Sequence, residues 1–376
     1  MIRHQIQPRP NWQERVETLG FAFHSDPEAY WDESAYYEFT AGQIDVLEEA
    51  ANQVHQLCLQ AIEHIVRHNL WERFQVPADW VGYVRESWSQ EDQTIYGRFD
   101  FGYDGAGPPK LLEYNADTPS ALLEAAVVQW HWLQDISPHD DQFNSIHECL
   151  IETWKLLQPK VDNILYFTAH PASLEDQITV QYLRDTAIQA GLATAYLPID
   201  AVGWDHARHL FLDGNNRPMR HVFKLYPWEW LLRERFGPFI LAKSTKWYEP
   251  PWKMLLSNKA ILPLLWELFP GHPYLLRSEF KEFGSSYVRK PCLGREGSNI
   301  QIVVDGKEEL HTDGPYDGAH VFQELFPAKP FDDKYPVLGC WIVGNVACGM
   351  GIRESDDRIT RNTSRFVPHL FKPAGQ

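Results

Sequence analysis

The spacing of apolar side chains changes along the chain, and each spacing predicts a different secondary structure. Residues 40–68 place apolar side chains at three- and four-residue steps, the pattern of a helix with one buried face. On this basis we expect the first 75 residues to be helical. After Pro77 the pattern becomes strand-like, so residues 94–101 and 110–114 are predicted to be strands joined by a turn rich in Gly and Pro.

The middle of the chain alternates helices and strands. A helical pattern at 119–133 precedes an apolar strand at 163–168. Ser173 and Asp176 have the spacing of a capping box that opens a helix, and Gly191 closes that helix. Further strands are predicted at 194–197, 210–213 and 221–226. This order of strand, helix and strand predicts a small α/β lobe.

The last third is predicted to be mostly antiparallel sheet. We expect Ser257 to cap a helix at 259–269, in which Pro263 disturbs the first turns. The predicted strands that follow cover 287–290, 300–304, 320–325, 337–343 and 347–353. Short turns between several of them favour antiparallel pairing. The whole chain is therefore expected to have an α+β fold with a mixed sheet and more than one lobe.

Composition and charge narrow the classes of function. The 376 residues carry a net charge of −17 at pH 7, which disfavours nucleic acid and anionic membranes as partners. The acidity either serves solubility alone or favours a cationic partner such as a basic amine. No apolar stretch reaches the ~20 residues that span a bilayer. The five cysteines lack CxxC spacing, which argues against a zinc site or a disulfide framework, and we expect a cytoplasmic protein.

The two strands after Pro77 carry candidate metal ligands. Side chains two residues apart share one face of a strand, so Arg98 points the same way as Asp100, and Glu113 the same way as Asn115. If the strands pair, two carboxylates, one amide oxygen and one guanidinium converge. Such oxygen ligands suit Mg²⁺ shared with substrate phosphates. The alternative is a solvated sheet face with ion pairs between strands.

A second candidate lies where Lys290 ends a predicted strand and a loop with Gly294 and Gly297 follows. Backbone amides of such a loop bind phosphate oxygens, and a Lys ammonium contacts them as a point charge. The segment is not a Walker A loop, because no GK[ST] opens a helix. The alternative is a hairpin turn that merely needs glycines.

Two further cations, Lys259 and Arg353, are weaker candidates for contacts with phosphate. Lys259 lies at a predicted helix start, where the helix dipole disfavours a cation unless a phosphate is near. Arg353 ends an apolar strand and is a candidate for stabilising a phosphoryl group during transfer. Either residue could instead be an ordinary surface cation. We find no Ser/His/Asp or Cys/His set that favours nucleophilic catalysis.

In combination, these segments resemble a known family. From about Tyr30 to His369 the chain contains, in order, RFD, LEYNADT, VFK…WE, EP.W, NKAILP.LW.LFP, KP..GR.GSNI, Q.L and IRE. Each piece alone is weak, but the series resembles the synthetase domain of glutathionylspermidine synthase. The chain looks most similar to the shorter, stand-alone members of that family, which are described as acid–amine ligases. The amidase domain of the bifunctional members has no counterpart here.

The resemblance implies an ATP-grasp fold in which ATP lies between two lobes under a lid loop. On this basis we expect residues 1–160 to form a helical region plus a metal-binding hairpin, 94–116, that packs in the catalytic core. Residues 161–256 would form an α/β substrate-binding lobe. Residues 257–376 would form the ATP-grasp lobes with a lid loop at 291–299.

The resemblance also implies a role for individual residues. Two Mg²⁺ ions would be held by Asp100, Glu113 and Asn115. ATP would be bound by Arg98, Lys259, Lys290, Gly294, Arg295, Gly297, Ser298, Gln323, Glu324, Leu325, Phe326, Val337, Arg358, Ile359 and Thr360. Arg98 and Arg353 would stabilise the transferring phosphoryl group and the tetrahedral species that follows.

The departures from the family concern the substrates. Where the family places Ser and Thr against glutathione, this chain has Thr118 and Trp230. Where an acidic residue meets the polyamine, alignment places Arg365, whose guanidinium would repel a cationic amine. The acidic pair Glu175-Asp176 is kept, either as part of the helix cap or as an amine site. We therefore hypothesise an acid–amine ligase with substrates other than glutathione and spermidine.

The resulting expectation is an ATP-dependent carboxylate–amine ligase that acts through an acyl phosphate. Its partners would be a small carboxylic acid and an amine. Two alternatives remain at this stage: an ATP-grasp kinase or ATPase without an amine acceptor, and a nucleotide-binding protein without turnover. The retained cations and carboxylates argue against the latter.

Overall fold

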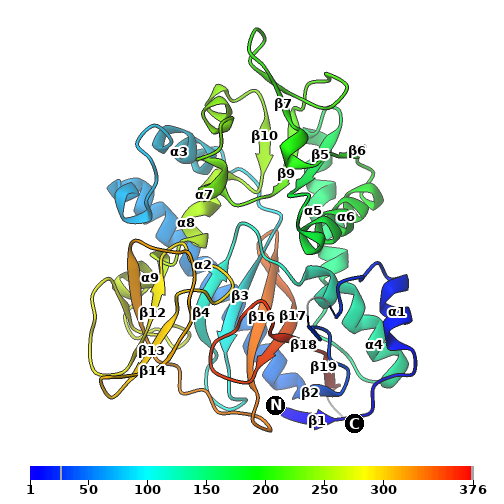
Figure 1. Ribbon diagram of the computed structural model, residues 1–376, viewed down its shortest axis with the longest axis vertical. Coiled ribbons are helices and arrows are strands. Elements are labelled where there is room, and N and C mark those ends of the chain that lie inside the picture. Colours follow the sequence, from blue (N-terminus) through cyan, green and yellow to red (C-terminus); the bar gives the residue numbers. More distant parts are fainter. Residues whose placement is uncertain (26–27, 374–376) are drawn as a thin grey trace.

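The computed structural model describes residues 1–25 and 28–373. At its centre is a five-stranded antiparallel sheet (Figure 1). Its strands, in spatial order, are β18 (Arg365–Val367), β17 (Val346–Ser355), β16 (Tyr335–Val343), β3 (Tyr96–Gly102) and β4 (Lys110–Asn115). The long helix α2 (Ala41–His68) packs on β16 and β17. Thr40 and Gln43 form a capping box at its start, so the predicted helix is confirmed.

The N-terminal region is not entirely helical, and that prediction was wrong. A three-stranded sheet is formed by β1 (Ile2–Gln5), β2 (Ala35–Thr40) and β19 (His369–Lys372), with α1 (Trp12–Thr18) between β1 and β2. Along β2, Ala35, Tyr37 and Phe39 are buried and alternate with partly exposed or exposed residues. Because β2 pairs with β19 from the far end of the chain, local helical periodicity could not reveal it.

The middle third forms a parallel sheet, which lies at the top of Figure 1. Its order is β10 (Lys246–Tyr248), β9 (His221–Leu225), β5 (Leu165–Ala169) and β6 (Thr194–Tyr196). Helix α6 (Leu174–Gln189) connects β5 to β6, as the βαβ pattern predicts. The strands β7 (Gly203–Asp205) and β8 (Leu210–Leu212) pair with each other in a separate hairpin.

The third main sheet is antiparallel. Its order is β11 (Ser278–Glu279), β15 (His320–Glu324), β12 (Tyr287–Pro291), β13 (Gln301–Val304) and β14 (Lys307–His311). Helix α9 (Ile261–Leu268) packs on β11 and β15. The predicted cap is wrong: Ser257 ends the preceding helix α8 (Met254–Ser257), and its hydroxyl accepts a hydrogen bond from Asp117 N. Asn258 instead accepts a bond from Ala260 N at the start of α9.

Shorter elements connect these sheets. They are η1 (Trp71–Phe74), α3 (Val81–Ser89), η2 (Glu124–Val128), α4 (Gln129–Ile136), α5 (Ile146–Leu157), η3 (Gln158–Lys160), η4 (Ile199–Ala201), α7 (Trp228–Leu231), η5 (Gly237–Ala242) and η6 (Pro251–Lys253). No helix within 1–25 and 28–373 combines the length and the apolar character needed to cross a membrane. The mixture of helices, parallel sheet and antiparallel sheet confirms the predicted α+β class.

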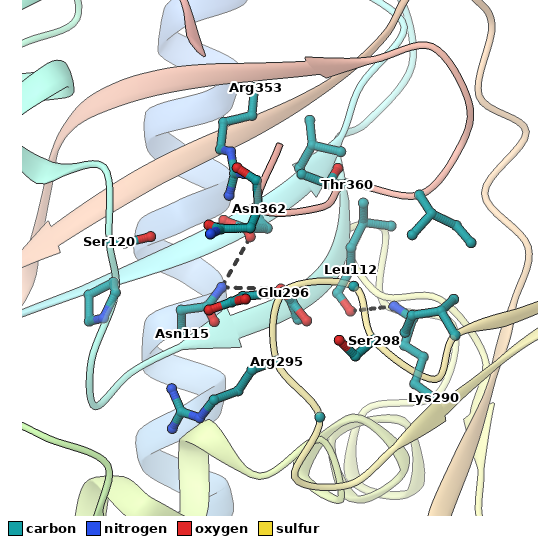
Figure 2. A pocket seen from close by; sticks show the side chains of 18 of the residues that line it. Leu112, Asn115, Ser120, Lys290, Arg295, Glu296, Ser298, Arg353, Thr360 and Asn362 are labelled. Atoms are coloured by element: carbon teal, nitrogen blue, oxygen red, sulfur yellow. Dashed lines mark hydrogen bonds between the residues drawn. The ribbon is translucent and has the colours of Figure 1, made fainter. Parts of the chain in front are cut away.

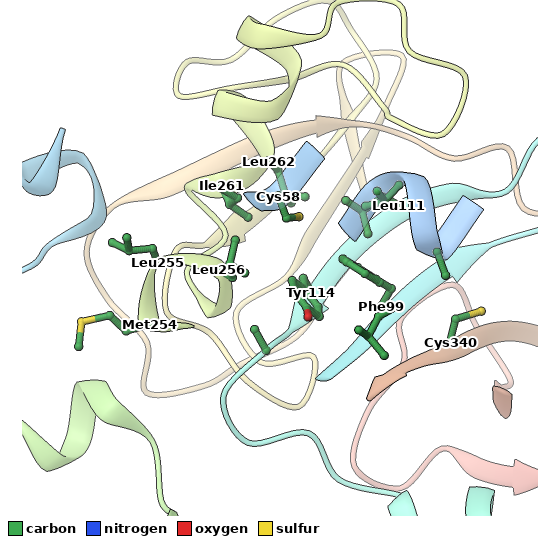
Figure 3. Packing of buried hydrophobic residues seen from close by; sticks show 14 of the residues in the cluster. Cys58, Phe99, Leu111, Tyr114, Met254, Leu255, Leu256, Ile261, Leu262 and Cys340 are labelled. Carbon is green, nitrogen blue, oxygen red and sulfur yellow. The ribbon is translucent and has the colours of Figure 1, made fainter. Parts of the chain in front are cut away.

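The core fixes the β3–β4 hairpin against α8 and α9. Figure 3 shows Phe99, Leu111 and Tyr114 of the hairpin packed beside Leu256 and Ile261. Each of these side chains is buried, and burying one such apolar side chain typically stabilises a fold by about 1.5–3 kcal/mol. Since neighbouring side chains of a strand alternate in direction, the opposite face of the hairpin is left for polar residues.

Candidate active site

A cavity of about 560 Å³ brings together every residue that the sequence selected as a candidate metal, ATP, catalytic or substrate contact, and leaves out Arg365. It is lined by Arg98, Asp100, Glu113, Asn115, Thr118, Glu175, Asp176, Trp230, Lys259, Lys290, Gly294, Arg295, Gly297, Ser298, Gln323, Glu324, Leu325, Phe326, Val337, Arg353, Arg358, Ile359 and Thr360. Those on strands belong to the central sheet and to the antiparallel sheet of β11–β15, while Glu175, Asp176 and Trp230 come from the helices α6 and α7, and the others come from loops. Their proximity is an observation, and their individual roles stay predictions.

One wall of the cavity is the polar face of the β3–β4 hairpin. Asp100 lies directly opposite Glu113, and Arg98 directly opposite Asn115. Arg98 donates two hydrogen bonds to Asp100, from Nε to Oδ1 at 2.6 Å and from Nη2 to Oδ2 at 3.0 Å. Asn115 Nδ2 donates to Asp100 Oδ2 at 3.0 Å and to Glu113 Oε1 at 3.2 Å. The face does contain an ion pair, but Arg98 and Asp100 are buried, so it is not the solvated face of the alternative interpretation.

A glycine on the neighbouring strand makes room for this arrangement. Gly339 of β16 pairs with Asp100, and a Cβ at Gly339 would lie 2.7 Å from Arg98 Cδ. Any larger residue at this position would push the guanidinium away from the carboxylate. The third contact of Arg98 is from Nη1 to the carbonyl oxygen of Ser120, at 2.6 Å. Three elements thus fix the direction of this guanidinium.

Two lysines form the cationic side of the cavity. Lys259 Nζ lies 3.0 Å from Glu113 Oε2. Lys290 Nζ donates to Leu112 O at 2.9 Å and to Gln323 Oε1 at 2.7 Å (Figure 2). Burial lowers the pKa of Lys290 to about 8, although Glu113 opposes this shift. Burial also acts to raise the pKa of Glu113, but Lys259 and Lys290 outweigh it and hold that pKa well below its usual range.

The donor set of the hairpin fits Mg²⁺ better than it fits zinc. Within 1–25 and 28–373 there is no cluster of three or more His, Cys, Asp and Glu side chains arranged to hold a metal. The convergent groups are two carboxylates and one amide, whose Nδ2 faces both carboxylates, and these are few ligands for a site made by protein alone. Mg²⁺ usually takes one or two carboxylates and completes its octahedral shell with phosphate oxygens and water. The residues present therefore fit a magnesium ion that arrives with a nucleotide.

The loop 291–299, which the sequence predicts to be a lid, lines the cavity and is held from two directions. Lys259 Nζ donates to Gly294 O at 2.8 Å, and Thr312 Oγ1 donates to Gly297 O at 2.5 Å. Gly297 has a φ of +69°, and a Cβ there would collide with Thr360 O. Only glycine satisfies both the left-handed backbone and this close approach.

Arg295 points away from Lys290 (Figure 2) and contacts α7 and the segment after β4. Its Nε and Nη2 donate to Glu229 Oε1 at 3.0 and 2.5 Å, and its Nη1 donates to Thr118 Oγ1 at 2.9 Å. Its Cζ lies 5.5 Å from the centre of the Trp230 ring. The loop 291–299 thus reaches Thr118 and Trp230, the two residues at which the sequence was expected to depart from the family that it resembles.

The acidic pair at the start of α6 lines the same side of the cavity. Asp176 N donates to Ser173 Oγ, so the predicted helix cap is present, and Asp176 also lines the cavity. Burial raises the pKa of Glu175. Burial and the neighbouring Glu175 raise the pKa of Asp176 to about 6. The cap and a substrate contact are therefore compatible.

Of the two remaining arginines with expected roles, Arg365 lies outside the cavity and Arg353 lines it. Arg365 does not line the cavity: it is exposed and its guanidinium lies 3.3 Å from Asp32 Oδ2, so the expected repulsion of an amine by Arg365 was wrong. Arg353 does line the cavity, and its Nη2 donates to the carbonyl oxygens of Arg361 and Asn362. The buried Arg353 Nε has no hydrogen-bond partner among the described residues.

Sequence reasoning missed several residues of the site. Leu112 and Ser120 contribute backbone carbonyl oxygens, which accept from Lys290 and Arg98 and for which side-chain identity gives no signal. Asn362 and Glu296 also line the cavity. Glu229 belongs to the VFK…WE motif, so the signal was present, but it was not assigned a role.

Comparisons with known proteins agree on one family. The model of the family described as glutathionylspermidine synthase preATP-grasp matches residues 3–372. A protein of Haemophilus influenzae described as an acid–amine ligase is 39% identical, and the match covers 97% of this chain and 98% of that protein. The bifunctional glutathionylspermidine synthetase/amidase of Escherichia coli is 28% identical over 94% of this chain, but only 61% of its own length is covered.

A solved structure supports the fold. The apo form of a glutathione synthetase-like effector from Globodera pallida superposes with a TM-score of 0.58. The superposition covers 98% of both chains at 12% sequence identity. At this identity the likeness concerns the arrangement of the elements alone.

Proposed function

Because this chain belongs to the glutathionylspermidine synthase family, we propose that it joins a carboxylic acid to an amine through an acyl phosphate formed from ATP. It is thus an ATP-dependent carbon–nitrogen ligase. One observation carries the proposal: carboxylates on the β3–β4 hairpin face the ammonium groups of Lys259 and Lys290 within one cavity. The lid loop closes over the same space.

The two walls have the charges that γ-phosphoryl transfer requires. Asp100, Glu113 and Asn115 would hold magnesium, up to two ions, which neutralises the triphosphate. Lys259 and Lys290 would contact the phosphate oxygens as point charges. Gln323, Glu324, Leu325, Phe326 and Val337 would form the adenine side, and Arg358, Ile359 and Thr360 would border the nucleotide from the third edge.

The arginines would act on the reacting atoms. Arg98 is fixed by Asp100 and by Ser120 O and is therefore oriented before the phosphoryl group arrives. Arg353 retains a buried N–H without a partner among the described residues, and this donor suits an oxygen that gains charge during transfer. A closed lid loop, with Gly297 against Thr360, excludes the water that would hydrolyse an acyl phosphate.

The substrates would lie on the parallel-sheet side, near Thr118, Trp230, Glu175 and Asp176. We propose that the acid is not glutathione, because the indole of Trp230 occupies a position where the family has a small hydroxyl residue. The lobe boundaries and the cytoplasmic location predicted from the sequence belong to the same proposal.

The test is an ADP-release assay with Mg²⁺ and ATP across a matrix of acids and amines, followed by mass spectrometry of the products. Ligation predicts ADP release that depends on both an acid and an amine, together with a product whose mass is their sum less one water. A stable phosphorylated acid without amide would indicate a kinase. ADP release that ignores both substrates would indicate an ATPase, and nucleotide binding without turnover a non-catalytic protein.

A further inference from the structure

One side chain of the lid loop, Arg295, makes the hydrogen bonds that connect the loop to the parallel-sheet side of the cavity. Within 1–25 and 28–373, the loop's hydrogen bonds to Lys259 and Thr312 keep it on the side of the antiparallel sheet. Among the described residues, Arg295 is the only residue of the loop whose side chain donates hydrogen bonds to the segment after β4 and to α7. Its contacts with Glu229 and Thr118 therefore join the loop to elements that no other side chain of the loop bonds to in the part of the chain that the structure describes.

The two residues that accept hydrogen bonds from Arg295, Glu229 and Thr118, are held in place by contacts that do not involve the loop. Asp117, next to Thr118, accepts a hydrogen bond from Trp228 N at 2.8 Å, and Trp228 is next to Glu229. The other oxygen of Asp117 accepts from Lys224 Nζ at 2.7 Å, and both side chains are completely buried. One buried ion pair thus sets the positions of Thr118 and Glu229 relative to each other, before Arg295 arrives.

The Arg295 contact is partly buried. The side chain of Arg295 is 24% exposed and that of Glu229 is 15% exposed. Both arginine nitrogens that face Glu229 share one carboxylate oxygen, and the third binds a neutral hydroxyl. Charge-assisted hydrogen bonds of this kind are stronger than neutral ones, so the contact favours one position of the loop.

We propose that Glu229 is a positioning residue for ligation, which together with Thr118 receives Arg295 and couples closure of the lid loop to the wall that binds the acid. The proposal rests on the proposed function, because the benefit of coupling is protection of an acyl phosphate. With the contact broken, water attacks the acyl carbon in place of the amine. The products are then the free acid and inorganic phosphate, so ADP is formed without amide.

The first test needs no substrate. Hydrogen–deuterium exchange of residues 291–299 is compared between wild type, Glu229→Gln and Arg295→Gln. We expect exchange in the loop to be about tenfold faster in both variants, since each loses a partly buried charged hydrogen bond. Glu267→Gln is the matched control, because Glu267 also accepts hydrogen bonds from two nitrogens of one arginine, Arg73, and neither of those residues lines the cavity.

Additional variants keep the test decisive. Thr118→Val removes the other acceptor with little change in shape and should speed exchange in the same peptide, so a failure of Glu229→Gln to fold does not end the test. The double variant Glu229→Gln/Arg295→Gln should exchange no faster than Arg295→Gln alone. Unchanged exchange in Glu229→Gln and Thr118→Val, or additive effects in the double variant, would overturn the inference.

The second readout is the ratio of ADP released to amide formed, measured with the acid–amine pair that the wild type uses. Glu229→Gln should raise this ratio several-fold, whereas Glu267→Gln should not. A merely structural role would lower the rates of ADP and amide formation together and leave the ratio unchanged, which would refute the coupling. If the wild type ligates no pair while the exchange results hold, the proposed function fails and the loop contact stands.

Discussion

Lys259 Nζ and Glu113 Oε2 lie 3.0 Å apart, and this ion pair links the two halves of the cavity. Lys259 precedes α9, while Glu113 lies on β4. A bound magnesium nucleotide would compete with this ion pair, because the metal would bind the Glu113 carboxylate and the phosphates would bind the Lys259 ammonium. The contact therefore marks where the nucleotide phosphates are expected.

Replacing Glu113 should abolish turnover without unfolding the protein. Glu113→Gln keeps the shape but removes the charge that would hold magnesium, and we expect ADP release to fall by at least about 100-fold. The circular dichroism spectrum and the melting temperature should stay close to the wild type. Glu63→Gln, which alters an exposed pair with Arg67, is the control. Near-normal turnover in Glu113→Gln would show that the metal assignment is wrong.

Lys290 should report on nucleotide binding. Lys290→Met removes the ammonium but keeps an unbranched side chain, so we expect the KM for ATP to rise at least about tenfold and kcat to fall. Isothermal titration with a non-hydrolysable ATP analogue and Mg²⁺ measures the binding loss directly. If the variant binds the analogue as tightly as the wild type, Lys290 does not contact the phosphates.

The sequence predicted the site better than it predicted the N-terminal fold. Asp100 and Glu113 could be placed face to face because strand periodicity and a short hairpin determine their relation. By contrast, β2 pairs with β19, and no local pattern encodes a partner so distant in the chain. The cavity itself depends on three sheets meeting, which only the resemblance to a family could anticipate.

The family motifs also contain residues that stabilise the fold. Glu249, from the motif EP.W, is fully buried and accepts hydrogen bonds from the backbone N–H groups of Ile95 and Tyr96. It thereby anchors the start of β3, which carries Arg98 and Asp100. Motif letters alone could not separate such structural residues from those that line the cavity.

Stability should fall as the pH drops below 6.5 because of His369. This ring is completely buried, and burial lowers its pKa to about 3. Its Nδ1 lies 2.9 Å from Gln129 Oε1, while Nε2 has no partner among the described residues, so a proton on Nε2 would be buried without an acceptor. A folded-state pKa below the unfolded value of about 6.5 means that the stabilisation is complete above pH 6.5 and is lost toward pH 3.

The expected loss is measurable by urea unfolding. Between pH 7 and pH 5, His369 should account for about 2 kcal/mol of the free energy of unfolding. His369→Gln should be less stable than the wild type at pH 7 but should lose less stability between the two pH values. His55, whose pKa burial lowers to about 4, would remain in the variant and preserve part of the slope. Equal slopes for variant and wild type would show that His369 does not titrate on unfolding.

Substitution of Gly297 should show whether the lid loop depends on its close contact with Thr360 O or only on a left-handed backbone at this position. Gly297→Ala introduces strain at a φ of +69° and a collision with Thr360 O, so we expect the loop to leave its position over the cavity. Gly306→Ala is the matched control, because Gly306 has a φ of +74° but a Cβ added there would have no atom within 4 Å. Both variants should lose roughly 1 kcal/mol of stability from backbone strain. Only Gly297→Ala should lower amide formation and raise the ratio of ADP to amide, because only there does the collision open the loop to water. An equal effect of both variants on that ratio would mean that strain, and not contact with Thr360, controls the loop.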